Sequence, residues 1–482
     1  MKDKKIFAII AALLLLIVSC SDDDSFTASP GNLLTFSTDT VRLDTLFSNV
    51  PSAHRSFWVY NHSGDGLRCS SIRLERGGDS GFRVNVDGIY LGEGSNWQAN
   101  EVEIRNKDSV RVFVEVTLPR ATTAEPQKQE DNLVFTLESG VEQRVNLNAW
   151  AWNARLLRNV RISKDSTINA SGEPTVIYGG LRVDSGATLT MAAGSKLYFH
   201  SDAGMDIYGR LISQGTAEAN VTLRGDRIDH MFDYLPYDRV PAQWIGLHLH
   251  ESSYGNELNY TDLHSSNTGI EIDSSDISRQ KLTLSHSTVH NCQGYGIYAD
   301  HSKLTLQNTQ VTNTLHDCMF ANGGDVEVNN CTFAQFYLFD GQRGAAFAFA
   351  DARPLTRLNV LNSLITGYAD DELMGSIKDT TATVNYLFDH CMIRTPKITT
   401  GDSIHFTNVW YEDVHDDKTM GEKHFKKFDT DNLIYDFALD SVSAAIDKAD
   451  PKTALPDDRL GIKRDDKPDL GAYEYVKSVD KN

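Results

Sequence analysis

The chain has 482 residues and a mass of 53.6 kDa, which leaves room for two or three domains. A hydrophobic content of 40% and a charged content of 23% exclude wholesale disorder. The net charge of −20 argues against a nucleic-acid partner, because phosphate binding needs a basic surface. Frequent Gly, Phe and Tyr against 12 Pro favour an all-β chain with many tight turns.

Residues 1–19 have the pattern of a secretory signal peptide, in which three lysines precede the apolar run from Ile6 to Val18. The sequence Leu-Ile-Val-Ser-Cys at 16–20 resembles the lipobox of bacterial lipoproteins. That resemblance implies cleavage before Cys20 and acylation of this residue with palmitate or a similar fatty chain, which would anchor the protein to a membrane. The alternative is an ordinary cleaved signal followed by an incidental cysteine.

Residues 20–31 read as an acidic tether, because Ser-Asp-Asp-Asp-Ser at 21–25 is a solvated charge run. The run also resembles the acidic sorting tag that follows the lipidated cysteine in surface-exposed lipoproteins of some Gram-negative anaerobes. The resemblance implies attachment to the outer membrane, with the protein facing the cell exterior.

Residues 32–154 alternate apolar and polar side chains in short runs, which predicts a β-sandwich of about seven strands. Turn clusters such as the one at 61–66 separate the runs. The order of the runs resembles Ig-like domains of the abnormal-spindle and hydin type. No catalytic pattern is present here, so we expect this Ig-like domain to be a spacer or a docking surface.

The middle of the chain carries an internal repeat. The pattern apolar, any, Asn or His, small, any, apolar occurs six times, with successive copies starting 22, 22, 32, 28 and 18 residues apart. The copies occupy residues 284–289, 306–311, 328–333, 360–365, 388–393 and 406–411. Steps near 22 residues with short strands predict a solenoid, in which stacked coils bury one another's apolar side chains.

With glycines at its corners, the region 155–425 resembles a right-handed parallel β-helix of the pectate-lyase-like superfamily. The third residue of each repeat would then lie in one turn column, which consists of His286, Asn308, Asn330, Asn362, His390 and Asn408. The resemblance implies an asparagine ladder, with side-chain amides bonded from coil to coil. We therefore expect structural rather than metal-binding roles for the two histidines.

A second pattern, Gly-apolar-any-apolar, predicts two outward rows on one sheet. Leu247, Ile270 and Ile297 should point inward, and so should Met319 in the related segment 318–322. Alternation then places the first outward row at His248, Glu271, Tyr298 and Phe320, and the second at His250, Asp273, Asp300 and Asn322. In the resembled fold, this sheet often lines a glycan groove.

These rows provide the candidate site residues. If the protein is an enzyme, the catalytic candidates are His248, His250, Glu271, Asp273 and Asp300, which could serve as acids and bases or bind a cation such as Ca²⁺. Aromatic side chains offer flat faces to sugar rings, and the candidates are Tyr234, Tyr237, Trp244, Tyr298 and Phe320. The first three belong to the long loop 225–243 and its end. The alternatives are a polar sheet surface and a loop that only covers the sheet's end.

Residues 426–482 resemble the closing segment of secreted β-helix proteins, and we expect this segment to cap the last coil. Five cysteines remain after Cys20, with no Cys-x-x-Cys pair, so neither a disulfide framework nor a zinc motif is indicated. Cys292 and Cys318 could meet, although buried free thiols are the simpler interpretation.

The motifs of known lyases and hydrolases of this fold are incomplete. The stretch 353–357 has two arginines at a spacing unlike that of pectate lyases, and the Asn-Thr-Asp motif of polygalacturonases is absent. We therefore expect a surface lipoprotein whose β-helix binds an extended ligand, most simply an extracellular polysaccharide. The alternatives are a divergent polysaccharide lyase or glycoside hydrolase, and a purely structural or adhesive surface protein.

Overall fold

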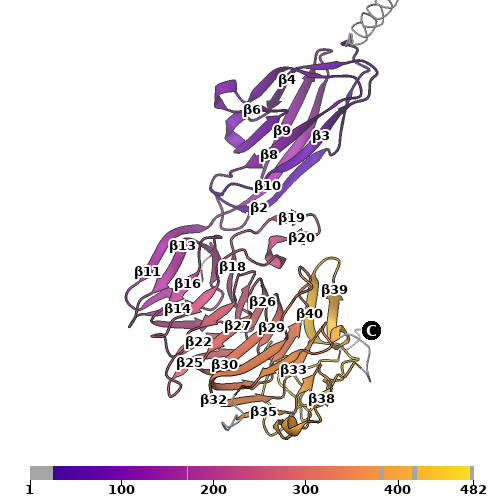
Figure 1. Ribbon diagram of the computed structural model, residues 1–482. Helices are drawn as coiled ribbons and strands as arrows, with labels where there is room; N and C mark the ends of the chain where they lie inside the picture. The colour runs from indigo at the N-terminus through magenta and orange to yellow at the C-terminus, as the bar shows by residue number, and fades with distance from the viewer. Residues whose placement is uncertain (1–24, 171, 379–384, 415–420, 478–482) are drawn as a thin grey trace, which may run out of the picture. The chain divides into compact units, whose positions relative to one another are not determined.

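The computed structural model describes residues 25–170, 172–378, 385–414 and 421–477. The predicted signal peptide, Cys20 and the start of the acidic tether lie outside the described residues. The chain divides into two compact units, the first ending at Asn153 and the second beginning at Ala154 (Figure 1). Within the described residues, no helix is long and apolar enough to cross a membrane.

The first unit consists of two five-stranded sheets that share one hydrophobic core. One sheet has the order β1 (Leu34–Phe36), β3 (Arg55–Asn61), β8 (Ser109–Val116), β5 (Phe82–Val86) and β6 (Ile89–Leu91). The other has the order β2 (Thr40–Phe47), β10 (Glu142–Trp152), β9 (Gln127–Leu137), β4 (Leu67–Leu74) and β7 (Gln98–Ile104). All pairings are antiparallel except that of β2 with β10. The Ig-like assignment of this unit stays a prediction.

The second unit is built on a ladder of 26 parallel strands, which stack into three sheets. The first sheet contains β16 (Met205–Ile207), β21 (Leu247–Leu249), β24 (Ile270–Ile272), β27 (Ile297–Asp300) and β34 (Leu373–Ser376). Four longer strands, β11 (Arg155–Ile162), β13 (Thr175–Val183), β30 (Met319–Asn329) and β32 (Phe347–Leu361), each contribute to the first sheet and to one other. This arrangement fits a β-helix.

The other two sheets complete each coil. The second sheet contains β12 (Ser166–Ile168), β14 (Thr188–Ala192), β17 (Arg210–Gln214), β22 (Asn256–Asn259), β25 (Gln280–Ser285), β28 (Lys303–Gln307), β35 (Tyr386–Asp389) and β37 (Phe406–Thr407). The third contains β15 (Lys196–Phe199), β18 (Val221–Gly225), β23 (Thr261–His264), β26 (Thr288–Cys292), β29 (Gln310–Thr314), β31 (Thr332–Gln335), β33 (Leu364–Gly367), β36 (Met392–Ile393) and β38 (Trp410–Tyr411). Short 3₁₀ turns occur at Gly77–Ser80, Glu93–Ser95, Tyr237–Arg239, Gly401–His405 and Gly421–His424.

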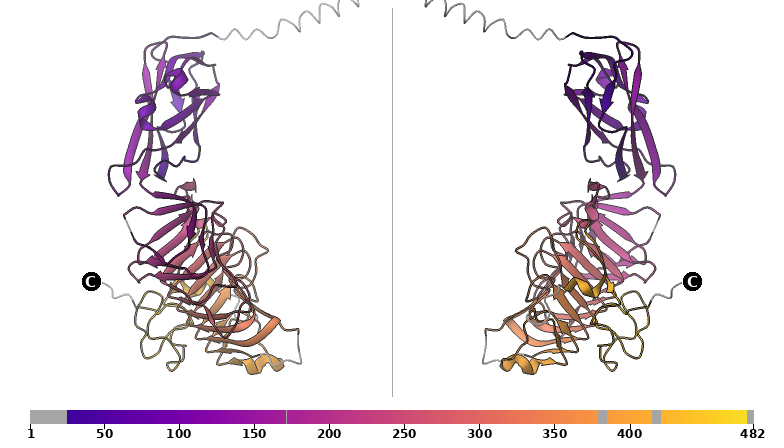
Figure 2. Two further views of the ribbon diagram at one scale, coloured as in Figure 1. Left: turned by 90° about the vertical axis from the view of Figure 1, so that its left-hand side faces the viewer. Right: turned by 90° about the vertical axis from the view of Figure 1, so that its right-hand side faces the viewer.

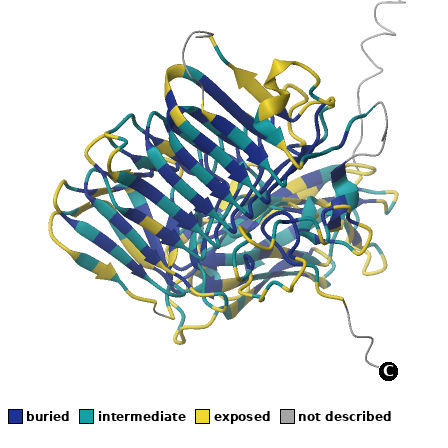
Figure 3. Cartoon of the chain, turned by 90° about the horizontal axis from the view of Figure 1, so that it is seen from below, coloured by how far each residue is buried: buried dark blue, intermediate teal, exposed yellow. Residues whose placement is uncertain are grey.

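The predicted inward column is confirmed. Leu247 pairs with Ile270, Ile270 with Ile297, and Ile297 with Met319, all in parallel register, and all four side chains are buried. They belong to one continuous apolar core that extends through the coils. The alternation of buried and partly exposed residues along each strand is visible in Figure 3. Each coil therefore buries its apolar side chains against the coils above and below, as the repeat required.

The turn column lies between the second and third sheets, and all six of its residues adopt left-handed backbone angles, with φ between 46° and 52°. Asparagine tolerates this region better than most residues, which explains why it recurs there. The predicted coil-to-coil ladder is present only in part. Side chains bond between coils where Asn308 meets His286 at 3.1 Å, Asn362 donates to Asn329 at 2.9 Å and Asn408 donates to Asp389 at 3.1 Å. Asn330 bonds to the C-terminal part of the chain, and Asn362 does so as well.

The C-terminal part begins with an antiparallel hairpin of β39 (Phe425–Asp429) and β40 (Ile434–Leu439). Residues 447–475, here called the C-terminal segment, then lie along the turn column, beside the stacked strands (Figure 2). Arg464 donates to Asn308 Oδ1, and Tyr473 Oη donates to Gln310 Oε1 at 2.5 Å. The prediction that this part simply closes the last coil is therefore too narrow. Its backbone groups bond to Asn330 and Asn362, and its side chains contact His286 and Asn308, so it covers the turn column on four coils.

Candidate functional site

The first outward row of the first sheet has the predicted register. His248 pairs with Glu271, Glu271 with Tyr298, and Tyr298 with Phe320. The row continues upstream, since Asp206 pairs with both Arg182 and His248. Sequence reasoning missed these two residues, although both lie in Gly-apolar-any-apolar segments, at 180–183 and 204–207. Extending the search upstream would have found them.

Each residue of the second outward row directly follows a paired strand segment, as His250 follows residues 247–249 and Asp273 follows residues 270–272. His250 donates its backbone N–H to Ile207 O, and Asp273 donates its own to Leu249 O, so successive coils stay in register. Asp300 pairs with Asn322 further along the same row. The two rows bring residues more than 20 positions apart into contact. We refer to them together as the first-sheet face.

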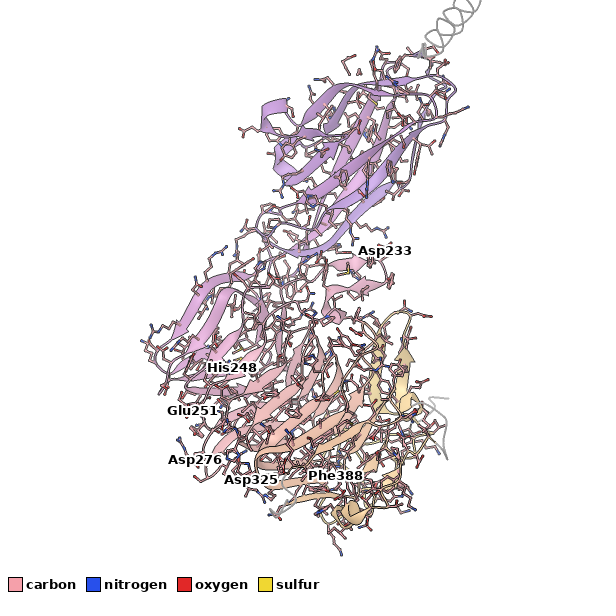
Figure 4. The ribbon with its side chains drawn as sticks, in the orientation of Figure 1. Asp233, His248, Glu251, Asp276, Asp325 and Phe388 are labelled. Atoms are coloured by element: carbon pink, nitrogen blue, oxygen red, sulfur yellow. The ribbon has the colours of Figure 1, made fainter. Side chains whose placement is uncertain are left out.

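Four residues of this face form a compact group that we call the His–Asp cluster: Asp206, His248, His250 and Asp273. His250 Nε2 lies 2.7 Å from Asp206 Oδ1, and His248 Nε2 lies 2.9 Å from Asp273 Oδ1. The two imidazole centroids are 3.8 Å apart. His248 marks the position of the cluster in Figure 4. The proximity of imidazole and carboxylate provides acid–base pairs and ligands for a cation.

A stack of flat groups continues from the cluster along the face. The Tyr208 ring is parallel to His250, with centroids 3.9 Å apart and an interplanar angle of 5°. The Arg182 guanidinium lies 4.1 Å above the Tyr208 ring and also contacts Asp184. These contacts restrain the orientation of the His250 ring.

The remaining acids of the predicted site lie outside the cluster. Asp300 accepts a hydrogen bond from Asn322 on the next coil at 2.8 Å and contacts Arg353, two coils further on, at 3.6 Å. Glu271 is exposed in the first row. Burial, followed by the charges of Asp300 and Glu271, raises the pKa of Tyr298. Of the five catalytic candidates, His248, His250 and Asp273 thus belong to the cluster, whereas Glu271 and Asp300 lie outside it.

Tyr298 and Phe320 form an aromatic platform next to these acids. Their rings stack at 5.5 Å, and Tyr295 contacts both rings at 5.1 and 5.9 Å. Both predicted platform residues are only partly buried, so part of each ring can meet a ligand. Apolar ring faces beside carboxylates are a combination that suits sugars, which present both C–H faces and hydroxyls.

The other three aromatic candidates do not extend this platform. The prediction that Trp244 binds a ligand is wrong, because its side chain is 0% exposed, stacks on Phe199 at 4.4 Å and donates to His264 O. Loop 225–243 is bound to the third sheet, where Ser265 donates to Asp238 O at 2.6 Å. Tyr234 is exposed on this loop, and the Arg227 guanidinium covers Tyr237. The loop therefore does not form a wall of the first-sheet face.

A buried lysine lies beneath the cluster. Lys281 donates its Nζ hydrogens to the carbonyl oxygens of His250 and Glu251. Burial lowers the pKa of this amine to about 8. Sequence reasoning missed Lys281, which occupies a register irregularity between Gln280 and Leu282. Its hydrogen bonds fix the backbone that carries the second outward row.

A second group of titratable residues lies on the third sheet. Asp262 Oδ1 is 3.1 Å from His264 Nδ1 and 3.2 Å from His290 Nε2. The two imidazoles hold the pKa of Asp262 well below its usual range, in spite of its burial. Sequence reasoning missed this group, although His264 and His290 occupy equivalent positions of adjacent coils.

The described cysteines, Cys69, Cys292, Cys318, Cys331 and Cys391, are free and buried. Cys292 approaches Ser266 Oγ at 3.4 Å, and Cys318 accepts from Thr314, so these two do not form a disulfide. Burial raises the pKa of Cys292 and Cys331 to about 12. The interpretation of these cysteines as buried free thiols is therefore confirmed.

The family model described as "Right handed beta helix region" matches residues 153–333 and 212–372 of this chain. Together with the parallel strand ladder, this match fits a right-handed β-helix. Among curated proteins, no relative matches the chain.

Solved structures with some similarity include three glycan hydrolases. A family 123 glycoside hydrolase from Clostridium perfringens shares 8% identity over 28% of this chain and 30% of that chain, with a TM-score of 0.19. The catalytic unit of a GH87 α-1,3-glucanase from Streptomyces thermodiastaticus shares 9% over 74% and 75%, with a TM-score of 0.24. A GH87 α-1,3-glucanase catalytic domain, solved with tetrasaccharides, shares 10% over 74% and 86%, with a TM-score of 0.22. The chain thus spans under a third of the family 123 enzyme.

Proposed function

We propose that the second unit binds an extended polysaccharide along the first-sheet face. The observation that carries the proposal is the continuous pair of outward rows, which combine the flat groups of Arg182, Tyr208, His250, Tyr298 and Phe320 with the carboxylates of Asp206, Glu271, Asp273 and Asp300. Coils repeat every ~4.8 Å, so equivalent side chains form a regular series along the solenoid axis. A regular series of flat and polar groups is suited to a polymer rather than to a compact ligand.

The polymer is expected to be neutral. The net charge of −20, together with exposed Asp206 and Glu271 on the face, repels a polyanionic glycan. Neutral sugars instead offer hydroxyls to the carboxylates and C–H faces to the ring platform of Tyr298 and Phe320.

A second candidate function is hydrolysis or elimination at the same face. Its support is the pairing of His250 with Asp206 at 2.7 Å and of His248 with Asp273 at 2.9 Å. Such pairs orient a ring nitrogen for general acid–base catalysis. Binding remains the first proposal, because the rows continue for several coils beyond these pairs.

We also propose that the mature protein is attached through lipidated Cys20 to the outer surface of an outer membrane, with the first unit, of proposed Ig-like type, as a spacer. The support is the signal, lipobox and acidic tether in the sequence. Labelling with a fatty-acid probe should mark the wild type and not Cys20→Ala. Digestion of the protein by protease added to whole cells tests the outward orientation.

Retention on immobilised neutral glucans and on a polyuronate tests the binding proposal. The double variant Tyr298→Ala/Phe320→Ala should lose at least tenfold in affinity for the retained glucan. Phe232→Ala removes a comparable exposed aromatic on loop 225–243 and should bind normally. Equal retention of both variants would refute the proposed face, and failure of the wild type on every polymer would favour a structural or adhesive role. Release of shortened chains or unsaturated products would establish the catalytic alternative.

A further inference from the structure

The His–Asp cluster places two adjacent imidazoles, tilted by 36° to one another, between two carboxylates. His248 Nδ1 and His250 Nε2 face Asp206, at 4.0 and 2.7 Å from its Oδ1. The opposite nitrogens, His248 Nε2 and His250 Nδ1, face Asp273, at 2.9 and 3.5 Å. Each ring therefore has one nitrogen directed at each acid.

On one side, the distances suit a metal ion. Ligand atoms of Asp206, His248 and His250 all lie within 4.8 Å of one another. A tetrahedral ion with bonds of about 2.1 Å holds its ligand atoms roughly 3.4 Å apart. The distances of 2.7 and 4.0 Å from Asp206 to the two rings lie on either side of that value. To hold one ion, Asp206 and His250 would have to separate and Asp206 and His248 to approach, each by less than ~1 Å.

On the other side, Asp273 has the position of an outer-shell partner. Histidines that bind a metal through one ring nitrogen usually donate the other N–H to a carboxylate or carbonyl, which fixes their tautomer and orientation. Asp273 faces the second nitrogen of both rings. Tyr208 stacks on His250 at 3.9 Å and restrains that ring further.

The charges and the solvent exposure also favour a cation. Asp206 and Asp273 carry two negative charges, with Glu271 in the same outward row. Asp206 is 52% exposed while His250 is 16% exposed, so an ion can enter from solvent and keep open positions for water or a ligand. Two nitrogens and one carboxylate oxygen are typical of zinc and related ions, whereas Ca²⁺ takes six to eight oxygens. The donor set thus differs from the calcium site that the sequence suggested.

From these observations we propose that Asp206, His248 and His250 bind one divalent transition-metal ion, with Asp273 orienting the two imidazoles. The ligand atoms of Asp262, His264 and His290 on the third sheet also lie within 4.8 Å of one another. That group differs in that His264 is buried and that, among the described contacts, no second carboxylate faces its two rings as Asp273 does in the His–Asp cluster. The proposal concerns the metal alone and does not depend on polysaccharide binding.

Calorimetric titration of the chelator-stripped protein with Zn²⁺ tests the proposal. The wild type should bind one equivalent at this site, and His248→Ala and His250→Ala should each lose that equivalent. Asp273→Asn should bind 10–100-fold more weakly, as expected for an outer-shell partner. Excess Ca²⁺ should not compete.

Two matched controls make the result specific. Glu271→Gln removes a neighbouring charge that is not a ligand, and His290→Ala removes an imidazole of the third-sheet group; neither should change Zn²⁺ binding at the proposed site. Circular dichroism confirms that each variant is folded. Unchanged Zn²⁺ binding in both His248→Ala and His250→Ala, or loss of the ion only in His290→Ala, would overturn the proposal.

Discussion

The first-sheet face and the turn column are two surfaces of the same β-helix. Both place histidine and asparagine side chains at coil spacing, yet they differ in what covers them. The C-terminal segment lies on the turn column and bonds to Asn308, Asn330 and Asn362. The first-sheet face keeps half-exposed rings and carboxylates. Residue type and spacing therefore identify a column, whereas its covering distinguishes a structural column from a binding surface.

This difference has an energetic consequence. A buried polar group that loses its partner costs about 1–3 kcal/mol, while exposed pairs contribute about 0–1 kcal/mol. Side chains of the turn column should therefore matter for stability, and side chains of the first-sheet face for ligands. Each prediction below tests this separation.

The largest effect is expected at Arg464. Its side chain is 2% exposed, pairs with Glu474 at 3.0 Å and donates to Asn308 Oδ1 and Gly471 O. Arg464→Ala leaves a buried carboxylate without its partner and should lower the free energy of unfolding of the second unit by about 3–5 kcal/mol. Urea denaturation measures the loss. The control Arg353→Ala removes a side chain that is 55% exposed and contacts Asp300 at 3.6 Å, and it should cost less than about 1 kcal/mol. Equal losses of unfolding free energy in the two variants would contradict the proposed difference between the turn column and the first-sheet face.

A smaller loss is expected at Asn330, which is fully buried in the turn column. Its amide oxygen accepts from Leu455 N at 2.9 Å, and its nitrogen donates to Asp469 O. Asn330→Ala should destabilise the second unit by about 1–3 kcal/mol, because both backbone partners lose their bond. Asn322→Ala, on the first-sheet face, is the matched amide variant and should cost less. A lower urea midpoint for Asn322→Ala than for Asn330→Ala would contradict the account.

The stability of the second unit should depend on pH through Lys281, which lies beneath the first-sheet face. Burial lowers its pKa to about 8, whereas an unfolded lysine titrates near ~10.4. Between these pH values the unfolded chain binds a proton that the folded protein does not, so this residue makes stability rise with pH, by about 1–3 kcal/mol. Lys281→Met should remove that part of the rise in urea midpoints measured from pH 8 to pH 10. An identical pH profile in wild type and variant would contradict the assignment.

The smallest effect concerns the thiols that directly follow the turn column. Cys331 and Cys391 are buried, and burial raises the pKa of each to about 12. Neither should react with a thiol reagent in the native protein, whereas both should react in denaturant. Arg464→Ala should speed the labelling of Cys331, because it weakens the attachment of the C-terminal segment to the column. Rapid labelling of the native wild type would show that the column is accessible.

The coil register was predictable because alternation and a repeat near 22 residues leave little freedom for the apolar positions. Leu247, Ile270 and Ile297 could be aligned without coordinates, and the first-sheet face followed from them. The covering of the turn column was not predictable, since Asp457 meets His286 across 171 positions with no shared pattern. The prediction that Trp244 binds a ligand was wrong for a related reason. A large aromatic at a loop end has the same local sequence whether it meets ligand or core.

The central claim is that a histidine of the first-sheet face serves to bind a ligand, whereas a histidine of the turn column serves to stabilise the fold. The most direct test compares His250→Ala with His286→Ala in urea stability and in Zn²⁺ binding. His286 contacts Asp457, Asn308 and the Tyr260 ring under the C-terminal segment. We expect His286→Ala to lower stability by about 1–2 kcal/mol and to keep the ion, and His250→Ala to lose the ion with less than about 1 kcal/mol of destabilisation. Loss of the ion in His286→Ala, with retention in His250→Ala, would contradict the account.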